Sequence, residues 1–416
     1  TQQLPFADPS EQQRWWAESA QLWQALMLPQ GEEKPEAELP REDRRFADPR
    51  WREQPVFAMI HQTYLLLTDR VLAMVEKMDT IEPGKREQLK FATQAMAEAL
   101  SPANFAATNP IVLDRIMESR GESLVKGMQN LLQDVQKGQL THSDPQAFVV
   151  GENIATTPGQ VVYETDLFQL IQYEPTTDKV LSIPLVIFPP WINRFYILDL
   201  NEKKSFVKWA VDQGLSVFMV SWKSADASMK DVVWDDYIAA QIDAIDHVKK
   251  RLRQPAVHAI GYCVAGTTLA ATLAILEAKG EADKVKSATF FTAQVDFADA
   301  GELLHFIDNQ QLAAIKGIER DGVVDGRYMA ATFNLLRGND LIWNYVVRNY
   351  LLGEDHTAFD LLHWNGDVTN LPAKWHRDYL RDLYRDNLLV KPGKLEALGT
   401  PIDLTTVKVP TYVQAG

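Results

Sequence analysis

The strongest constraint on the fold of this chain is a series of continuous apolar runs in its second part. The runs are enriched in β-branched and aromatic residues and occupy positions 183–190, 215–222, 256–262, 287–296 and 408–415. Apolar runs without polar alternation are typical of strands that are covered on both faces, as in a parallel sheet. Helical patterns that end at Gly214 and Gly280 lie between some of these runs. This order predicts an α/β fold with a mostly parallel central sheet and right-handed crossovers.

Two further regions precede or interrupt this sheet. Residues 1–150 carry helical patterns, at 10–27 and 55–78 among others, and predict a helical N-terminal region. Residues 151–416 are the predicted α/β core. Within this core, positions 296–399 depart from the alternation and are rich in Trp, Tyr, His and Asn. Because a long insertion in an α/β sheet most often covers the active site, we expect these residues to form a cap or lid.

Composition and charge exclude several classes of function. The net charge of −14 argues against nucleic-acid binding, since a phosphate backbone needs a basic surface. A single cysteine excludes an intramolecular disulfide framework and fits a reducing cytoplasm, and no apolar run is long enough to predict a transmembrane segment. The sequence has no histidine pair at zinc spacing and no glycine-rich phosphate loop, so we expect neither a metal nor a bound cofactor. The chain begins with Thr1 and lacks a signal pattern, so we expect a fragment of a cytoplasmic protein.

The single cysteine lies where the third apolar run ends. The stretch AVHAIGYCVAG predicts a strand, a sharp turn at Cys263 and a helix, which is the layout of the nucleophile elbow G-x-Nuc-x-G of α/β-hydrolases. Gly261 satisfies the upstream position, whereas Ala265 departs from the downstream glycine and Gly266 follows it. The helix N-terminus is expected to lower the pKa of the thiol, and the N–H of Val264 is the expected oxyanion donor. The alternative is a small, inert, buried cysteine.

The segment GYCVAG resembles the lipase-like box of the polyhydroxyalkanoate synthases, which polymerise 3-hydroxyacyl groups from coenzyme A thioesters. The resemblance is closest to the short-chain, class I type and covers about residue 43 to the end, with the N-terminal domain of the synthases extending into the core to about 215. The other similar segments, in the order of the family, are 101–110, 157–180, 189–200, 217–229, 339–353 and 359–372. Two departures are Ala265, and Trp191 where many members have Cys.

The resemblance implies an acyltransferase that polymerises (R)-3-hydroxyacyl-CoA, with 3-hydroxybutyryl-CoA as the expected substrate, into polyhydroxyalkanoate with release of CoA. A thiolate suits this reaction because it exchanges one thioester for another, so the acyl group stays activated when water is excluded. The resemblance also implies a homodimer on the surface of polymer granules in the cytoplasm, with the growing polyester as a partner. The alternatives are a thiol-dependent esterase or depolymerase of the same fold, or a non-catalytic granule-binding fragment.

A thiol nucleophile needs a general base, normally a histidine oriented by a carboxylate, and in this fold both follow the nucleophile in the sequence. The resemblance places the Asp and the His beyond Gly416, so we expect the chain as given to lack both and to be inactive in isolation. His258 lies five residues before Cys263 on the same strand and is expected to be structural. We expect a solvated or substrate-side position for His305, His356, His363 and His376, and a surface position for His61, His142 and His247.

Other residues are candidates for oxyanion or substrate binding. Ile192 or a neighbour is the expected second oxyanion donor, through its backbone N–H. Asp199 belongs to a recurrent family segment, although helix capping explains it equally well. Arg194, Lys203 and Lys204 are the basic residues expected nearest the mouth of the site, as ligands of the CoA phosphates or as solvated surface residues. The candidates for lining an acyl tunnel, with core packing as the alternative, are Trp343, Tyr345, Trp364 and Asn365.

Overall fold

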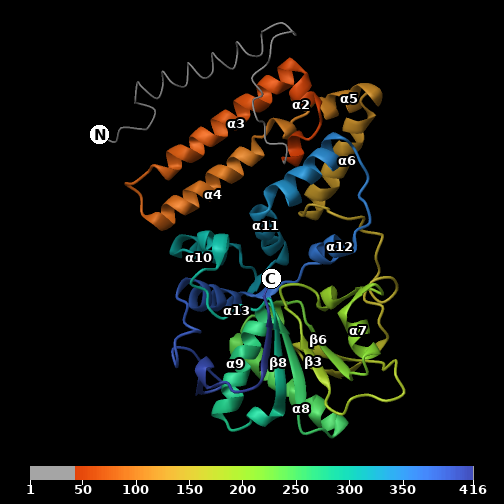
Figure 1. The fold of residues 1–416 in the computed structure, drawn as a ribbon, viewed down its shortest axis with the longest axis vertical. Coiled ribbons are helices and arrows are strands. Elements are labelled where there is room, and N and C mark those ends of the chain that lie inside the picture. Colours follow the sequence, from red (N-terminus) through yellow and green to blue (C-terminus); the bar gives the residue numbers. More distant parts are fainter. Residues whose placement is uncertain (1–42, 416) are drawn as a thin grey trace. The chain divides into compact units, whose positions relative to one another are not determined.

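The computed structural model describes residues 43–415, which form two compact units (Figure 1). The first unit comprises the chain up to Leu140 together with Phe333–Asp355, and the second comprises Thr141–Thr332 and His356 onward. The helix predicted at 10–27 lies outside the described residues. Residues 333–355, which the sequence assigns to the cap insertion, therefore belong to the helical unit, and the boundary between the units falls near 140 rather than 150.

The second unit is built on a seven-stranded sheet with the order β1-β2-β6-β3-β7-β8-β13. The strands from β6 to β13 in this order are parallel, whereas β1 and β2 are antiparallel. The bounds are β1 Gly159–Glu164, β2 Phe168–Tyr173, β3 Leu185–Phe188, β6 Val217–Trp222, β7 Val257–Tyr262, β8 Val285–Phe291 and β13 Thr411–Gln414. Each of the five apolar runs overlaps one parallel strand, which confirms the predicted sheet.

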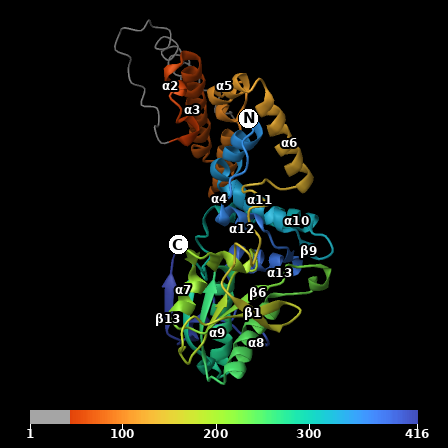
Figure 2. The ribbon, with the colours of Figure 1, turned by 90° about the vertical axis from the view of Figure 1, so that its right-hand side faces the viewer.

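Helices cover both faces of this sheet (Figures 1 and 2). The helices α8 (Trp234–Leu252) and α9 (Val264–Ala278) pack on one face, and α7 (Phe206–Asp212) packs on the other. Along β3, Val186 and Phe188 belong to the core under α8 and α9, whereas Leu185 and Ile187 belong to the core under α7. All four side chains are buried, and this two-sided burial is why the strand has no polar alternation.

Between β8 and β13 the chain leaves the sheet for more than 100 residues. The elements of this stretch within the second unit include α10 (Asn309–Ile318), β9 (Val323–Val324), α12 (Asp360–Gly366), β10 (Leu371–Pro372), α13 (Ala373–Asp378), the π-helical segment η10 (Tyr379–Arg385), β11 (Glu396–Ala397) and β12 (Thr400–Pro401). Helix α11 (Gly326–Leu336) runs from this unit into the other. A short pair, β4 (Asp199–Asn201) and β5 (Lys204–Ser205), lies between β3 and α7. The insertion predicted at 296–399 corresponds to this stretch, and its action as a lid stays a prediction.

The first unit is helical, as predicted. Its helices are α2 (Arg50–Glu53), α3 (Pro55–Glu76), α4 (Pro83–Ala99), α5 (Pro110–Glu118) and α6 (Glu122–Lys137), with π-helical segments η8 (Asn339–Trp343) and η9 (Val346–Leu351). Segment η9 joins this unit because the Tyr350 hydroxyl donates to Asp134 of α6 at 2.6 Å and Asn130 donates to the Asn349 carbonyl at 3.0 Å.

The predicted surface position of two histidines is wrong. His61 and His142 are 1% and 6% exposed, respectively. The ring of His61 stacks on Phe46 with centroids 3.9 Å apart, next to buried Trp51. Burial lowers the pKa of His61 to about 4, so this imidazole is neutral at physiological pH and serves as an aromatic core residue.

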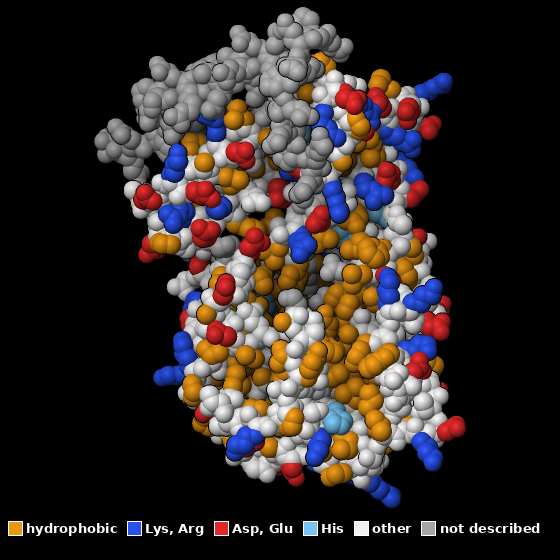
Figure 3. Space-filling view, viewed as in Figure 1, with side chains coloured by type: hydrophobic (Ala, Val, Ile, Leu, Met, Phe, Trp, Pro, Cys, Tyr) orange, Lys and Arg blue, Asp and Glu red, His pale blue; other side chains and the backbone are white. Residues whose placement is uncertain are grey.

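One face of the described residues is mixed in charge. On the face in Figure 3, Lys and Arg side chains are interspersed with Asp and Glu, and hydrophobic side chains gather between them. Over residues 43–415, no helix is both long enough and apolar enough to cross a membrane.

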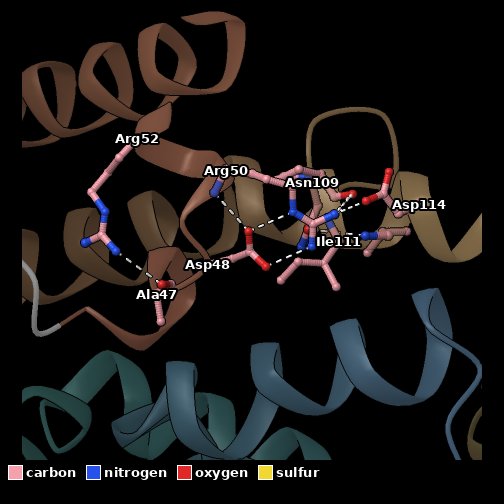
Figure 4. Close-up of polar contacts among 9 residues, drawn as sticks. Ala47, Asp48, Arg50, Arg52, Asn109, Ile111 and Asp114 are labelled. Atoms are coloured by element: carbon pink, nitrogen blue, oxygen red, sulfur yellow. Dashed lines mark hydrogen bonds and ion pairs between the residues drawn. The ribbon is translucent and has the colours of Figure 1, made fainter. Parts of the chain in front are cut away.

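The start of α5 is fixed by polar contacts with the segment around α2 (Figure 4). The Arg50 guanidinium donates to Asp48 at 2.7 Å and also pairs with Asp114 of α5. Asn109 caps α5, because its side-chain oxygen accepts from the Ile111 N–H at 3.0 Å. The amide of the same side chain donates to the Ala103 carbonyl at 2.7 Å. One buried asparagine therefore satisfies groups on both sides of the turn.

Replacing Asn109 by Ala should lower the free energy of unfolding by about 2 kcal/mol, because the cap and a buried hydrogen bond are lost together. Asn109→Ser keeps a cap acceptor and should lose about half of that. Urea unfolding of the two variants checks this expectation. Equal stability of Asn109→Ala and the unsubstituted chain would show that the cap is not needed.

Candidate active site

The predicted elbow is present, and the turn between its strand and its helix consists of one residue. Strand β7 ends at Tyr262 and α9 begins at Val264, so Cys263 alone makes the turn. Its backbone has φ 53° and ψ −128°, a conformation that costs a non-glycine residue about 1–3 kcal/mol. The Cys263 N–H donates to the Phe291 carbonyl at 2.9 Å, and its own carbonyl accepts from the N–H of Gly266 at 2.9 Å. Bonds to a neighbouring strand and to the following helix thus hold the strained turn.

The glycines of the elbow allow strand and helix to touch. A Cβ added at Gly261 would lie 2.5 Å from the Gly266 Cα, and a Cβ added at Gly266 would lie 2.5 Å from the Ala293 Cβ and 2.7 Å from the Gly261 carbonyl oxygen. The methyl of Ala265 is instead fully buried in the hydrophobic core. The departure at Ala265 is therefore tolerated because the close approach falls on the next residue.

The thiol of Cys263 is exposed to solvent, although protein surrounds it closely. Burial raises its pKa, and a hydrogen bond from the Val264 N–H opposes this rise. The net shift is opposite to the lowering that the helix N-terminus predicts. The thiol is therefore accessible to a ligand, although neighbouring protein atoms raise its pKa.

Two tyrosines that sequence reasoning missed lie in the electrostatic range of this thiol. Tyr379 and Tyr384 belong to η10, and burial is the main cause of the raised pKa of each, with Cys263 as a further cause. A hydrogen bond between the two phenols raises the pKa of Tyr379 and lowers that of Tyr384. The Tyr379 ring stacks on Trp375 with centroids 5.0 Å apart, and Phe297 packs against Tyr384 at 4.7 Å. Because the pKa of each is raised, both phenols are neutral at physiological pH. No local sequence pattern distinguishes them from core aromatics.

The loop that follows β3 begins next to the elbow. Strands β3 and β7 are parallel neighbours with Phe188 opposite Gly261, so both chains leave the sheet at the same edge. Ile192 lies four residues beyond Phe188, and its side chain packs against the core cluster that contains Val264. Ile192 therefore follows β3 at the same edge of the sheet as Cys263, and the role of its N–H as oxyanion donor stays a prediction.

Asp199 has a structural environment. Its carboxylate is 1% exposed and accepts from the Thr157 hydroxyl and the Ser205 hydroxyl, each at 2.6 Å. Ser205 is in turn the N-cap of α7 and accepts from the Lys208 N–H at 2.8 Å. This network favours the helix-capping interpretation of Asp199 over contact with substrate.

The basic candidates are largely engaged. Arg194 pairs with Asp367 at 3.1 Å, and Lys204 pairs with the buried Asp360 at 2.9 Å. Lys203 is exposed, and its backbone N–H donates to the side-chain oxygen of Asn201. Of the three, only the ammonium of Lys203 makes no ion pair with the described residues.

The tunnel candidates fall in different units. Trp364 and Asn365 are half-buried on α12, and the Trp364 indole N–H donates to the Arg194 carbonyl at 2.8 Å. Trp343 and Tyr345 belong to the helical unit and are not placed relative to Cys263. Trp191, the second departure from the family, is buried and stacks on Tyr237 with centroids 3.9 Å apart.

Histidines beside the sheet have structural surroundings. His258 has its Nδ1 at 2.7 Å from a β8 serine hydroxyl, in keeping with the expected structural role. His376 is 3% exposed, so a solvated position is wrong for it, and burial lowers its pKa to about 4. His363 is half-buried, and the side chain of His305 lies outside the described part. In residues 43–415 no group of three or more His, Cys, Asp or Glu side chains is arranged to hold a metal ion.

The raised pKa of Cys263 predicts the pH dependence of its alkylation. Because only the thiolate reacts, the rate with iodoacetamide should rise with pH and reach its midpoint above that of glutathione measured in parallel. Cys263 is the only cysteine in the chain, so mass spectrometry reads this site directly. A midpoint at or below that of glutathione would mean that the helix N-terminus outweighs burial.

The contact between β7 and α9 predicts a contrast between neighbouring substitutions. Gly266→Ala should lower the free energy of unfolding by about 1–3 kcal/mol, because the methyl collides with backbone and with Ala293. Ala265→Gly should cost about 1 kcal/mol or less. Urea unfolding measures both, and a Gly266→Ala chain more stable than Ala265→Gly would contradict the geometry.

Two family models match the chain. Residues 42–210 match the N-terminus of poly-beta-hydroxybutyrate polymerase (PhaC), and residues 185–415 match the alpha/beta hydrolase fold. The second match covers more than half of the chain and confirms the α/β-hydrolase architecture that the elbow predicts. Among solved structures, a probable hydrolytic enzyme from Pseudomonas aeruginosa PAO1 has a TM-score of 0.34 at 11% identity, covering 62% of this chain and 72% of that one.

Curated relatives are much more similar in sequence. The chain is 44% identical over 382 residues to a poly(3-hydroxyalkanoate) polymerase subunit PhaC of Rhizobium meliloti (strain 1021), covering 90% of this chain and 62% of that protein. It is 43% identical over 411 residues to the subunit of the same name from Cupriavidus necator, covering 97% of this chain and 68% of that protein. The chain thus spans about two thirds of the length of these relatives. Identity at this level, over nearly all of its residues, means that the chain belongs to the family of poly(3-hydroxyalkanoate) polymerases.

Proposed function

We propose that the protein is an acyltransferase that polymerises (R)-3-hydroxyacyl groups from their CoA thioesters into polyhydroxyalkanoate and releases CoA. Membership of the polymerase family supports this reaction class. The single observation that carries the proposal is the elbow, where an accessible thiol occupies a strained turn at the edge of the sheet. Nucleophiles of this fold attack carbonyl carbons from that position.

In the proposed reaction Cys263, as a thiolate, attacks the thioester carbonyl carbon. A bond forms between this carbon and Sγ, and the carbonyl electrons move to the oxygen. Collapse of the intermediate breaks the bond to the CoA sulfur, which leaves as a thiolate and then takes up a proton. The acyl group remains on Cys263 as a thioester, so it is still activated for attack by the 3-hydroxyl of another unit.

The oxyanion of this intermediate needs hydrogen-bond donors. Val264 is the first residue of α9, and its backbone N–H already contacts the Cys263 sulfur. This contact supports the proposed role of the Val264 N–H as one oxyanion donor. The Ile192 N–H, on the loop after β3, is the proposed second donor. Tyr379 and Tyr384 add neutral phenols to the same surroundings.

A general base is also needed, both for the thiol and for the attacking hydroxyl. Because burial raises the pKa of Cys263, the neutral thiol predominates at neutral pH. Among the described residues, no histidine contributes to the pKa shift of Cys263. We propose that the base is a histidine oriented by a carboxylate, as is usual for this class of nucleophile, and activity is to be tested on the natural full-length protein.

The proposal extends to the substrate and the setting. Resemblance of the sequence segments to class I synthases favours short acyl chains, so 3-hydroxybutyryl-CoA is the first substrate to test. The CoA thioester is a substrate, and the proposal includes no cofactor. We further propose that the protein acts as a homodimer on polymer granules in the cytoplasm.

Cys263→Ala in the full-length protein should reduce CoA release from 3-hydroxybutyryl-CoA by several orders of magnitude, because it removes the nucleophile. The acyl adduct seen by intact-protein mass spectrometry should vanish at the same time. Cys263→Ser is the matched control and should acylate slowly, as an oxygen ester.

Two results would contradict the proposal. Polymer formation by Cys263→Ala at the wild-type rate would exclude the thiol as acyl carrier. A wild-type protein that yields only free 3-hydroxybutyrate would instead indicate the thiol-dependent esterase.

A further inference from the structure

One short segment, residues 364–370, makes several contacts with the loop after β3. Its contacts with the loop are a bond from the Trp364 indole to the Arg194 carbonyl at 2.8 Å, the Arg194–Asp367 pair at 3.1 Å, a bond from the Tyr196 hydroxyl to Asp367 at 2.8 Å, and a β-bridge between Asn193 and Val368. The contacts come from side chains and backbone alike, so the path of the loop is fixed at several points.

The contact nearest the proposed oxyanion donor is made by Thr369. This residue is 2% exposed, and its hydroxyl lies 2.7 Å from the Trp191 carbonyl oxygen and 2.6 Å from the Ile192 carbonyl oxygen. A hydroxyl has one proton, which is shared between the two carbonyls. Both acceptors are thereby satisfied in a position closed to water.

The carbonyl of Trp191 and the N–H of Ile192 belong to the same peptide unit. This unit is planar and trans, so its carbonyl and its N–H point in opposite directions. A donor that fixes the Trp191 carbonyl therefore fixes the direction of the Ile192 N–H on the other side. A hydrogen bond to the carbonyl also polarises the peptide and makes the N–H a stronger donor.

We propose that Thr369 is a positioning residue for acyl transfer, whose hydroxyl orients the Trp191–Ile192 peptide so that the Ile192 N–H faces the oxyanion formed at Cys263. This inference rests on the proposed function, because it deepens the assignment of the oxyanion site. The group that the oriented N–H would bind is the thioester carbonyl of the substrate, whereas Thr369 itself touches neither the substrate nor the Cys263 sulfur.

Removing an oxyanion donor lowers the rate of an enzyme by about 10²–10³-fold. A donor that is still present but no longer oriented retains part of its effect. We therefore expect Thr369→Val, which replaces the hydroxyl by a methyl of similar size, to reduce the acylation rate by about 10–100-fold. Thr369→Ser keeps the hydroxyl and should stay within about threefold of the wild type.

A second reaction at the same sulfur distinguishes a positioning role of Thr369 from a purely structural one. Alkylation by iodoacetamide passes through no oxyanion, so it depends on the thiol and on access but not on the Ile192 N–H. Thr369→Val should therefore slow acylation while leaving the alkylation rate of Cys263 within about twofold. A general disturbance of the elbow would slow both reactions together.

Thr272→Val is a matched control for the loss of a buried hydroxyl. Thr272 lies on α9, is fully buried, and donates to Gln241 at 2.6 Å, away from the loop after β3. This variant should keep both rates, normalised to folded protein, close to the wild type.

The experiment measures single-turnover CoA release from 3-hydroxybutyryl-CoA and iodoacetamide alkylation for the full-length wild type and the three variants. Slower acylation with unchanged alkylation in Thr369→Val, and recovery in Thr369→Ser, is the expected result. Acylation by Thr369→Val at the wild-type rate, or an equal loss of both reactions, would overturn the inference. A wild type that is alkylated at Cys263 yet releases no CoA would overturn the proposed function itself, and the inference with it.

Discussion

The site depends on the close approach of two glycines, one at the end of β7 and one in the first turn of α9. A Cβ on either Gly261 or Gly266 would lie within 2.7 Å of the other residue's backbone. The strand and the helix are therefore too close at this point for any residue other than glycine. This contact leaves a single residue to make the turn, and Cys263 therefore adopts a positive φ. The strain, about 1–3 kcal/mol, is offset by the burial of the helix, in which every residue from Val264 to Leu276 is buried.

The parallel sheet then determines what lies beside the thiol. Because β3 and β7 are paired with Phe188 opposite Gly261, the loops that follow them emerge at one edge, and each can supply one backbone N–H. The loop after β3 is fixed by Thr369, a residue 178 positions further along the chain than Trp191. A segment from the long excursion between β8 and β13 therefore determines the geometry of a loop on the sheet. This arrangement links the part of the chain predicted as a cap to the chemistry at the elbow.

Much of the fold could be predicted because burial on both faces leaves a clear trace in the sequence. The parallel strands have continuous apolar runs, and the elbow has its glycine and its small-residue helix. Strands β1 and β2 were missed because β1 lies at the edge of the sheet and is largely exposed. Their antiparallel pairing gives no apolar run of the kind that identified the others.

The rest of the site could not be predicted because it depends on contacts between residues far apart in the chain. Tyr379, Tyr384 and Thr369 have ordinary local sequences and acquire a role only through what they face. The sequence indicated a helix N-terminus beside Cys263 but not the crowding that raises its pKa. His61 is buried by a ring from a different helix segment, Phe46, which helical periodicity alone does not reveal.

The central claim is that the thiol and two backbone N–H groups from neighbouring loops form one acyl-transfer site. A crystal structure of the full-length protein with Cys263 alkylated by a haloketone tests it most directly, because the ketone oxygen, one methylene further from the sulfur than that of a thioester, can reach the same hydrogen-bond donors. The account predicts that this oxygen lies about 2.7–3.1 Å from the nitrogens of both Val264 and Ile192. A ketone oxygen directed into solvent, with the Ile192 N–H turned away from Cys263, would contradict it.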